Sequence, residues 1–121
     1  NYVGRTQHPI SEADLVSIQN NKIIKIQKNL KKQSNEQIGE FLGVMKMNGD
    51  GSEEFVKAYN FLEESHKGKF HGSSSLKKGY LTDMIQELVN MQKEMKPIFV
   101  NGEWTEIDTL QDLENARKKF L

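Results

Sequence analysis

The chain has 121 residues, with 17 basic and 17 acidic side chains and no cysteine. Its net charge of zero gives no reason to expect nucleic acid or a membrane surface as a partner. The lack of cysteine excludes disulfide bonds and thiolate metal sites. No apolar run approaches the roughly twenty residues of a membrane helix, and we expect no signal peptide. We therefore expect a cytoplasmic protein, with residues 1–121 forming one domain or part of one.

The first predicted elements are two strands, residues 14–19 and 22–27, joined by Asn20-Asn21. Asparagine tolerates the positive φ angles of a tight turn, so the pair is predicted to form a β-hairpin. Residues 40–46 follow as a nearly continuous apolar run, which is typical of a buried central strand. Gly43 within this run indicates a bulge or a close backbone approach.

Ser52 is the predicted N-cap of a first helix, which extends to about residue 66. Its buried stripe is expected at Phe55, at Ala58 or Tyr59, and at Leu62, because these positions recur at helical spacing.

Residues 68–78 are rich in glycine, serine and lysine and predict a mobile loop or connection. Thr82 is then expected to cap a second helix. Its apolar residues Ile85, Leu88 and Val89 keep the three-to-four spacing of a helix. Met84, Met91 and Met95 are expected to fill gaps in the core.

Residues 96–100 predict a short strand, which Pro97 places at a sheet edge or at a strand start. A second short strand is predicted for residues 104–108, followed by a helix. The resulting order, β-β-β-α-α-β-β-α, indicates an α/β fold with a mixed sheet, an antiparallel hairpin and about three helices.

The final strand and helix carry the main candidate site. Side chains alternate along a strand, so Trp104, Glu106 and Asp108 are expected on one face. Thr109 is a plausible N-cap, with Asp112 in the capping-box position three residues later. A carboxylate between the end of a strand and a helix lies where open α/β sheets place ligands. The alternative is that Asp108 merely caps the helix together with Thr109.

Four stretches carry a family resemblance in consistent order: Gly4-Arg-Thr-Gln-His-Pro-Ile-Ser-Glu-Ala13, Gly39-Glu-Phe-Leu-Gly-Val-Met45, Gly79-Tyr-Leu-Thr-Asp-Met-Ile-Gln-Glu-Leu88 and Val100-Asn-Gly-Glu-Trp-Thr-Glu-Ile-Asp-Thr-Leu-Gln-Asp-Leu-Glu-Asn-Ala-Arg117. They resemble the sugar-nucleotidyltransferase-like superfamily, and most closely the small cytidylyltransferases that activate phosphocholine or 2-aminoethylphosphonate. The resemblance implies the C-terminal half of a Rossmann-like nucleotidyltransferase. The Gly-rich triphosphate loop and the second acidic site of the family have no counterpart here.

For the C-terminal segment, the resemblance implies a metal site. The carboxylate of Asp108 would help to hold Mg²⁺ against the nucleotide phosphates, and Glu106 would be the second carboxylate, as a direct ligand or through water. Magnesium accepts hard oxygen ligands and neutralises charge on phosphate oxygens. No residue is assigned as a catalytic acid, base or nucleophile.

The resemblance also implies an acceptor site. Tyr80 and Asp83 match the region that receives a cationic amine in choline-type relatives. Trp104 could close that pocket, and Arg5 and His8 could contact the acceptor phosphate. Two structural alternatives remain open: Asp83 can simply favour the helix N-terminus, and Trp104 can be a core residue.

The sequence thus predicts part of an enzyme that transfers a nucleotidyl group, taken to be cytidylyl from CTP, to a small phosphorylated or phosphonate acceptor, releasing pyrophosphate. Without the triphosphate loop, we expect the isolated chain to be inactive. The expected partner is the N-terminal half of the same enzyme or a second copy of the chain. The alternative is a non-catalytic α/β binding or assembly module that kept this fold.

Overall fold

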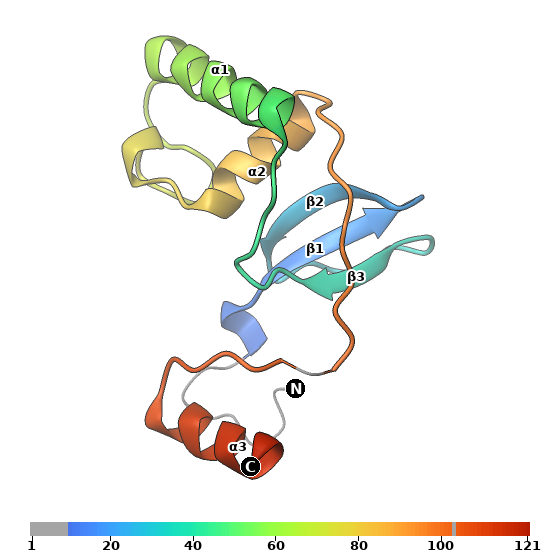
Figure 1. Ribbon diagram of the computed structural model, residues 1–121. Helices are drawn as coiled ribbons and strands as arrows, with labels where there is room; N and C mark the ends of the chain where they lie inside the picture. The colour runs from blue at the N-terminus through green and yellow to red at the C-terminus, as the bar shows by residue number, and fades with distance from the viewer. Residues whose placement is uncertain (1–9, 103) are drawn as a thin grey trace.

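The computed structural model describes residues 10–102 and 104–121, and these ranges form a small α/β structure (Figure 1). The elements in chain order are β1 (Asp14–Gln19), β2 (Lys22–Lys28), β3 (Gln37–Glu40), α1 (Gly49–Ser65), α2 (Leu81–Asn90) and α3 (Leu110–Phe120), with short 3₁₀ helices at Ile10–Glu12 and Leu76–Lys78. The predicted α/β class and the three helices are confirmed, whereas a Rossmann-like arrangement is not established by this architecture.

The sheet has three strands in the order β2-β1-β3, and both pairings are antiparallel. Its hairpin is the predicted one: Asn20 and Asn21 form the turn with φ angles of 49° and 59°. The register places Val16 opposite Ile26. The expectation of a mixed sheet is wrong for the described residues, since no parallel pair occurs among them.

The central strand predicted at residues 40–46 does not form, and the third strand covers earlier residues of the chain. β3 ends at Glu40, and it is an edge strand paired with β1. The N–H of Phe41 makes a last hydrogen bond to the Asp14 carbonyl at 2.8 Å, and the chain then leaves the sheet. Gly43 has a φ of 75°, which is incompatible with continued extended pairing. The apolar run therefore leaves the sheet instead of extending it.

The first helix begins earlier than predicted. Asn48, not Ser52, is the N-cap of α1, and its side-chain oxygen accepts a hydrogen bond from the N–H of Gly51 at 2.8 Å. The predicted stripe is confirmed, because Ala58 and Leu62 are buried on this helix.

The second helix also begins earlier, at Leu81, with Tyr80 instead of Thr82 at the N-cap. The loop before it is anchored in the core. Phe70 is only 2% exposed, and its backbone exchanges hydrogen bonds of 3.0 and 2.8 Å with Ser73. One buried aromatic ring thus fixes a segment whose composition suggests mobility.

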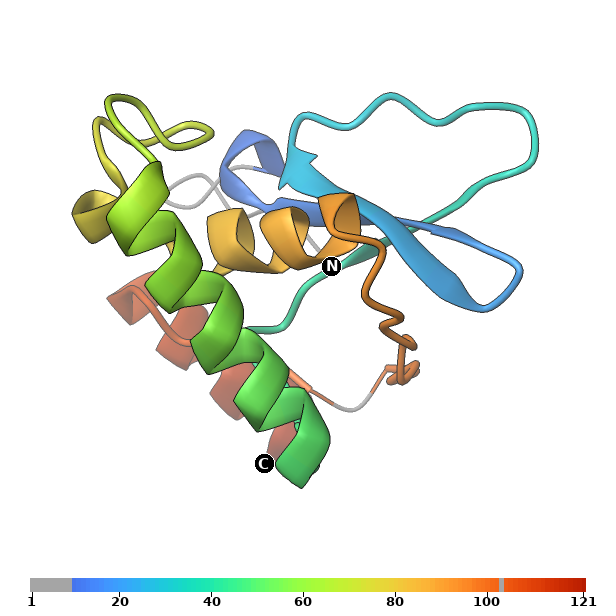
Figure 2. The same cartoon turned by 90° about the horizontal axis from the view of Figure 1, so that it is seen from above.

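α2 lies between the sheet and α1, and it contributes to two apolar clusters (Figure 2). One cluster joins Met84 and Leu88 to residues of α1 and to Phe70. The other joins Ile85 to the strands β1 and β2. The methionines behave as predicted: Met84 is buried, Met91 packs partly against the first cluster, and Met95 packs partly against both.

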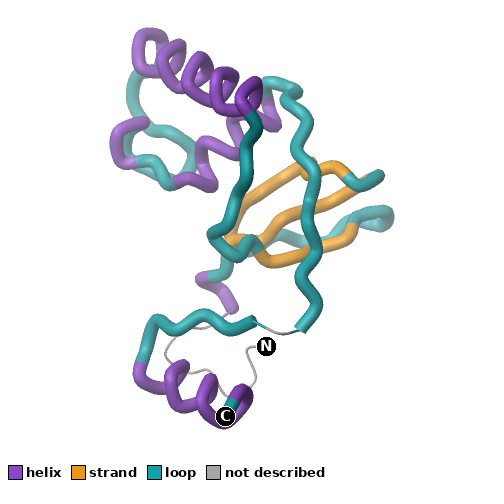
Figure 3. Tube along the Cα trace, viewed as in Figure 1, coloured by secondary structure: helices purple, strands orange, loops and turns teal. Residues whose placement is uncertain are grey.

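The strands predicted at residues 96–100 and 104–108 do not form, and the segment between α2 and α3 is loop where it is described (Figure 3). One backbone bond ties its start to the sheet, from the N–H of Ile23 to the Met95 carbonyl at 3.0 Å. Beyond it, Ile98 is 84% exposed. A strand requires a neighbouring strand for its backbone groups, and no described strand pairs with these residues.

α3 lies at the opposite end of the molecule from α1 (Figure 1). The chain exposes 9000 Å² to solvent, whereas a compact protein of 13.9 kDa exposes roughly 6,700 Å². The chain is therefore more extended than an independent domain of its size. Within the described ranges, no helix has both the length and the apolar character needed to cross a membrane.

Candidate functional site

The predicted site residues fall into two groups that the structure keeps apart. Tyr80 and Asp83 lie at the start of α2, beside α1, whereas residues 104–108 run alongside α3 (Figure 1). Arg5 and His8 lie outside the described residues. The described part of the chain therefore carries two separate candidate regions.

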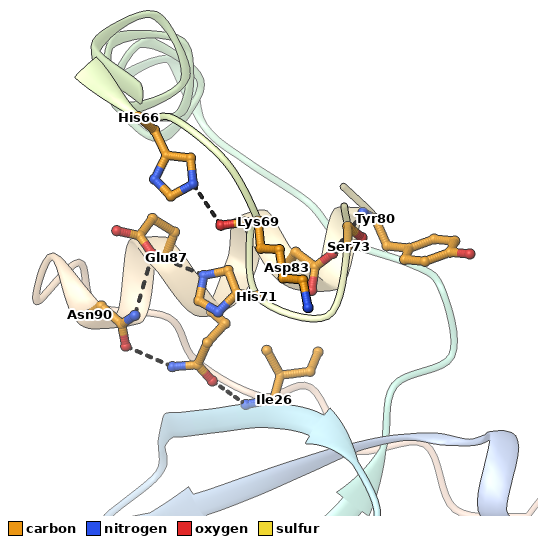
Figure 4. Close-up of polar contacts among 10 residues, drawn as sticks. Ile26, His66, Lys69, His71, Ser73, Tyr80, Asp83, Glu87 and Asn90 are labelled. Atoms are coloured by element: carbon orange, nitrogen blue, oxygen red, sulfur yellow. Dashed lines mark hydrogen bonds and ion pairs between the residues drawn. The ribbon is translucent and has the colours of Figure 1, made fainter. Parts of the chain in front are cut away.

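Asp83 lies in the first turn of α2 and caps the N–H of the N-cap residue Tyr80, whose own side chain makes no capping hydrogen bond. Its Oδ2 atom accepts hydrogen bonds from the Tyr80 N–H at 3.0 Å and from the Ser73 hydroxyl at 2.9 Å (Figure 4). Asp83 thus has the structural role at the helix start that the sequence left open, and its part in acceptor binding stays a prediction. One carboxylate oxygen joins the helix start to the preceding loop.

Further polar contacts hold α2 in place between the loop and the sheet. His71 Nε2 donates to Glu87 Oε2 at 2.9 Å, and the N–H of Ile26 donates to Gln86 Oε1 at 2.8 Å. Gln86 Nε2 also donates to Asn90 Oδ1 at 2.9 Å. Figure 4 shows His71, Glu87 and Asn90 between the loop and Ile26 of β2. Because β2 is an edge strand, Gln86 satisfies a backbone donor that would otherwise have no partner in the sheet.

Tyr80 stands at the rim of an open recess of about 180 Å³ between α1 and α2. Tyr80 is 74% exposed, and its ring points away from Asp83 and Ser73 (Figure 4). The recess is predominantly apolar and aromatic, and it is lined by Phe55, Tyr59, Phe70, Leu76, Gly79, Tyr80, Leu81 and Met84. Aromatic faces of this kind can receive an apolar or cationic group.

The second region is the segment before α3. Glu106 and Asp108 are both exposed, and Trp104 is half-buried. The common face predicted for these side chains depended on a strand, and residues 104–108 are not a strand. The two carboxylates nevertheless reach solvent from one short segment.

The start of α3 is a capping box, as predicted. The Thr109 hydroxyl oxygen accepts from the Asp112 N–H at 3.2 Å, and Asp112 Oδ2 accepts from the Thr109 N–H at 3.0 Å. Asp112 Oδ2 also accepts from the N–H of Asp108 at 3.3 Å. The backbone of Asp108 is therefore fixed by the helix that follows it.

The end of α3 contacts the beginning of the same segment. Lys119 Nζ donates to the carbonyl oxygens of Gly102 at 2.8 Å and of Trp104 at 3.0 Å. Sequence reasoning missed this lysine, because a contact across 15 to 17 residues leaves no local pattern. It also missed Ser73, whose only sequence signal is its place in a polar loop.

Glu106 and Asp108 are the oxygen donors that the family resemblance assigns to a magnesium ion. Mg²⁺ in phosphate-transferring sites is held by one or two carboxylates together with substrate phosphates and water. Glu106 and Asp108 supply that number of carboxylates in an exposed position. Among residues 10–102 and 104–121, no group of three or more histidine, cysteine, aspartate or glutamate side chains could hold a metal ion. A metal ion at Glu106 and Asp108 would thus need ligands beyond the described side chains.

The sequence is similar to that of a CTP:phosphoglutamine cytidylyltransferase from Campylobacter jejuni, with 24% identity over 111 residues. The similarity covers 91% of this chain and 42% of that enzyme, so the chain spans less than half the length of its relative. No family model and no solved structure matches the chain. The comparison supports the predicted resemblance at the level of a distant cytidylyltransferase-like relationship.

Proposed function

We propose that this chain is the C-terminal part of a nucleotidyltransferase that transfers a cytidylyl group from CTP to a small phosphorylated or phosphonate acceptor. The observation that carries the proposal is the similarity of 91% of the chain to 42% of a cytidylyltransferase. The surface of 9000 Å² supports it, because a chain this extended is suited to completion by further protein.

In this reaction a phosphate or phosphonate oxygen of the acceptor attacks the α-phosphorus of CTP, and the bond to the β-phosphate oxygen breaks to release pyrophosphate. Asp108 and Glu106 are the residues proposed to hold Mg²⁺. When bound, the ion would neutralise negative charge on the phosphate oxygens. The chain's own contribution is to present two carboxylates from a segment that α3 holds at both ends.

The recess beside Tyr80 is proposed as the place for the acceptor's organic group. Because the described residues keep this recess apart from residues 104–108, the proposal requires the complete enzyme to bring the two regions together. Its aromatic lining favours an amine or another compact cationic or apolar group over a second phosphate. Asp83 is already engaged by the cap, so its proposed part is to hold Tyr80 at the rim. Trp104, Arg5 and His8 remain proposed acceptor contacts.

The test uses the 121-residue chain mixed with the part of the Campylobacter enzyme that the similarity does not cover. Pyrophosphate release is measured with CTP, Mg²⁺ and each of three acceptors: phosphocholine, 2-aminoethylphosphonate and phosphoglutamine. We expect release from the mixture and none from either part alone. Release by the 121-residue chain alone would contradict the expected inactivity of the fragment.

Asp108→Asn tests the metal role in the same mixture. We expect activity to fall by about 100-fold or more, since a charge facing the phosphates is lost. Glu114→Gln is the matched control, because Glu114 is an exposed carboxylate on α3. Equal activity of Asp108→Asn and Glu114→Gln would refute the assignment.

A second candidate function, a non-catalytic assembly module, is favoured by the exposed apolar side chains between α2 and α3, such as Ile98. The oligomeric state distinguishes the assembly module from the enzyme part. A stable homodimer by sedimentation, without pyrophosphate release in any mixture, would favour the module.

A further inference from the structure

One helix holds both ends of the segment that bears the candidate carboxylates. Near its start, α3 contacts the backbone at Asp108 and Thr109 through Asp112. Near its end, it contacts the backbone at Gly102 and Trp104 through Lys119. The exposed Glu106 lies between these two points of attachment.

The contacts of Asp112 go beyond those of a helix cap. A capping carboxylate needs to satisfy only the N-cap N–H. Here the single atom Oδ2 accepts from the Thr109 N–H at 3.0 Å, from the Thr109 hydroxyl at 2.8 Å and from the Asp108 N–H at 3.3 Å. Asp112 is only 3% exposed, and a buried carboxylate requires such donors to remain favourable.

The contacts of Lys119 are also unusual for its position. A lysine in the last turn of a helix ordinarily interacts with the helix's own terminal carbonyls. Lys119 instead donates to two carbonyl oxygens of the preceding segment, and its ammonium lies 4.9 Å from the centre of the Phe120 ring. The two hydrogen bonds from the Lys119 ammonium restrict the backbone at Gly102 and at Trp104.

Both side chains project from the same face of the helix. Seven residues separate them, which corresponds to nearly two full turns and about 10.5 Å along the axis. The buried Ala116 lies on this face between them, where a small side chain leaves room for a close neighbour. Figure 1 shows the segment running along α3, in line with contacts at both helix ends.

We infer that Asp112 and Lys119 are positioning residues, which hold residues 104–109 against α3 so that Glu106 and Asp108 are presented in a fixed arrangement. The inference rests on the proposed function only for what the carboxylates then bind. The two side chains act on the backbone of the segment, not on a substrate.

The first test is amide hydrogen exchange in the full 121-residue chain. Asp112→Ala is expected to speed exchange of the Asp108 and Thr109 amides by about tenfold or more, while the amides of α2 are unchanged. Glu114→Gln, which removes an exposed charge from the same helix, is expected to have no effect. Unchanged exchange at both amides in Asp112→Ala would overturn the role of Asp112.

The second test leaves the helix cap intact. Trp104 is the only tryptophan in the sequence, so its fluorescence reports directly on the segment. Lys119→Met is expected to raise quenching by acrylamide about twofold, and Lys119→Arg is expected to restore the original value, since a guanidinium can donate to both carbonyls. Lys118→Met is the control, because it removes the same charge from an exposed neighbouring position. Equal quenching in Lys119→Met and Lys118→Met would overturn the role of Lys119.

The functional readout is the Mg²⁺ concentration for half-maximal pyrophosphate release in the reconstituted mixture. Lys119→Met is expected to raise it about tenfold, with a smaller effect on the rate at saturating Mg²⁺. If Asp108→Asn leaves release unchanged while the exchange and quenching results hold, the proposed metal site fails and the positioning role stands. If the Mg²⁺ dependence follows Asp108 but not Lys119, the positioning inference fails alone.

Discussion

The region of the sheet, α1 and α2 is held together by apolar burial, whereas the region of α3 is held together by polar contacts to backbone groups. In the first region, Phe70 and Ile85 are each 2% exposed and belong to two clusters that meet at α2. In the second, the buried residues of α3 are Asp112 and Ala116. Side chains that would pack in a core, such as Leu110, are exposed there.

The two regions should therefore control different properties. The apolar region should set the global stability, and the polar region should set the arrangement of Glu106 and Asp108. Apolar burial is the main source of folding free energy, so changes in the first region should alter global stability. Hydrogen bonds to a surface segment add little to global stability but restrict its conformation. Substitutions can therefore show whether the two regions respond independently.

The largest expected effect is in the apolar region. Phe70→Ala should lower the free energy of unfolding by about 3–5 kcal/mol, because a fully buried ring is removed. Phe61→Ala is the matched control, since Phe61 is 61% exposed, and its effect should stay below about 1 kcal/mol. Urea unfolding followed by circular dichroism measures both. Similar losses in the two variants would show that Phe70 does not anchor the core.

The next effect concerns the edge of the sheet. Gln86→Met should cost about 1–3 kcal/mol, because the Ile26 N–H loses its acceptor. Gln86→Glu keeps an oxygen at this position and should retain most of the stability at neutral pH. The same urea titration compares them. A Gln86→Met variant as stable as Gln86→Glu would mean that the bond to Ile26 contributes nothing.

A smaller effect is expected in the polar region, and it should remain local. Thr109→Ala removes the N-cap of α3 and should destabilise that helix by about 1 kcal/mol. Amide exchange should increase in α3 and stay constant in α2. Thr105→Ala, at an exposed position in the same segment, is the control. Equal increases in α2 and α3 would show that the two regions unfold as one cooperative unit.

The smallest effect is a pH dependence. A hydrogen bond and the positive charge of Lys93 lower the pKa of Glu54, and Lys22, 2.6 Å away, lowers the pKa of Glu94 in the same way. A carboxyl whose pKa is lower in the folded state adds stability that is complete above the usual glutamate pKa of about 4.3. This stability is lost as the pH falls through the lower folded value.

The measurement is urea unfolding between pH 6 and pH 3 of the wild-type chain and Lys93→Met. The variant should be slightly less stable at pH 6, and the difference should vanish at the acid end. Both groups are solvent-accessible, so the effect is small and should weaken with added salt. Lys67→Met is the control, since Lys67 is exposed and forms no ion pair within the described ranges. A wild-type advantage over Lys93→Met that persists unchanged at pH 3 would contradict this account.

Much of the local structure could be predicted from the sequence. Asn20-Asn21 specified the hairpin turn, the spacing of Ala58 and Leu62 specified the buried face of α1, and Thr109 with Asp112 specified the start of α3. Each of these signals depends on residues within about four positions of one another, so a short stretch of sequence is enough to predict it. The boundaries of α1 and α2 were missed by a few residues, because several neighbouring side chains could serve as caps.

The tertiary structure decided which extended segments became strands. Residues 40–46 and 96–100 have the apolar character of strands, but strand formation requires a partner at the right place. Among the described residues, the sheet pairs β1 with β2 and with β3, and beyond the end of β3 no strand pairs with these segments. The candidate site divides in the same way. The sequence predicted the capping role of Asp112, and it offered Asp108 and Glu106 as candidate metal ligands, which stays a prediction. Only the fold brought Lys119 to the backbone of Gly102 and Trp104. Contacts between distant residues depend on the path of the whole chain, and that path is absent from any short pattern.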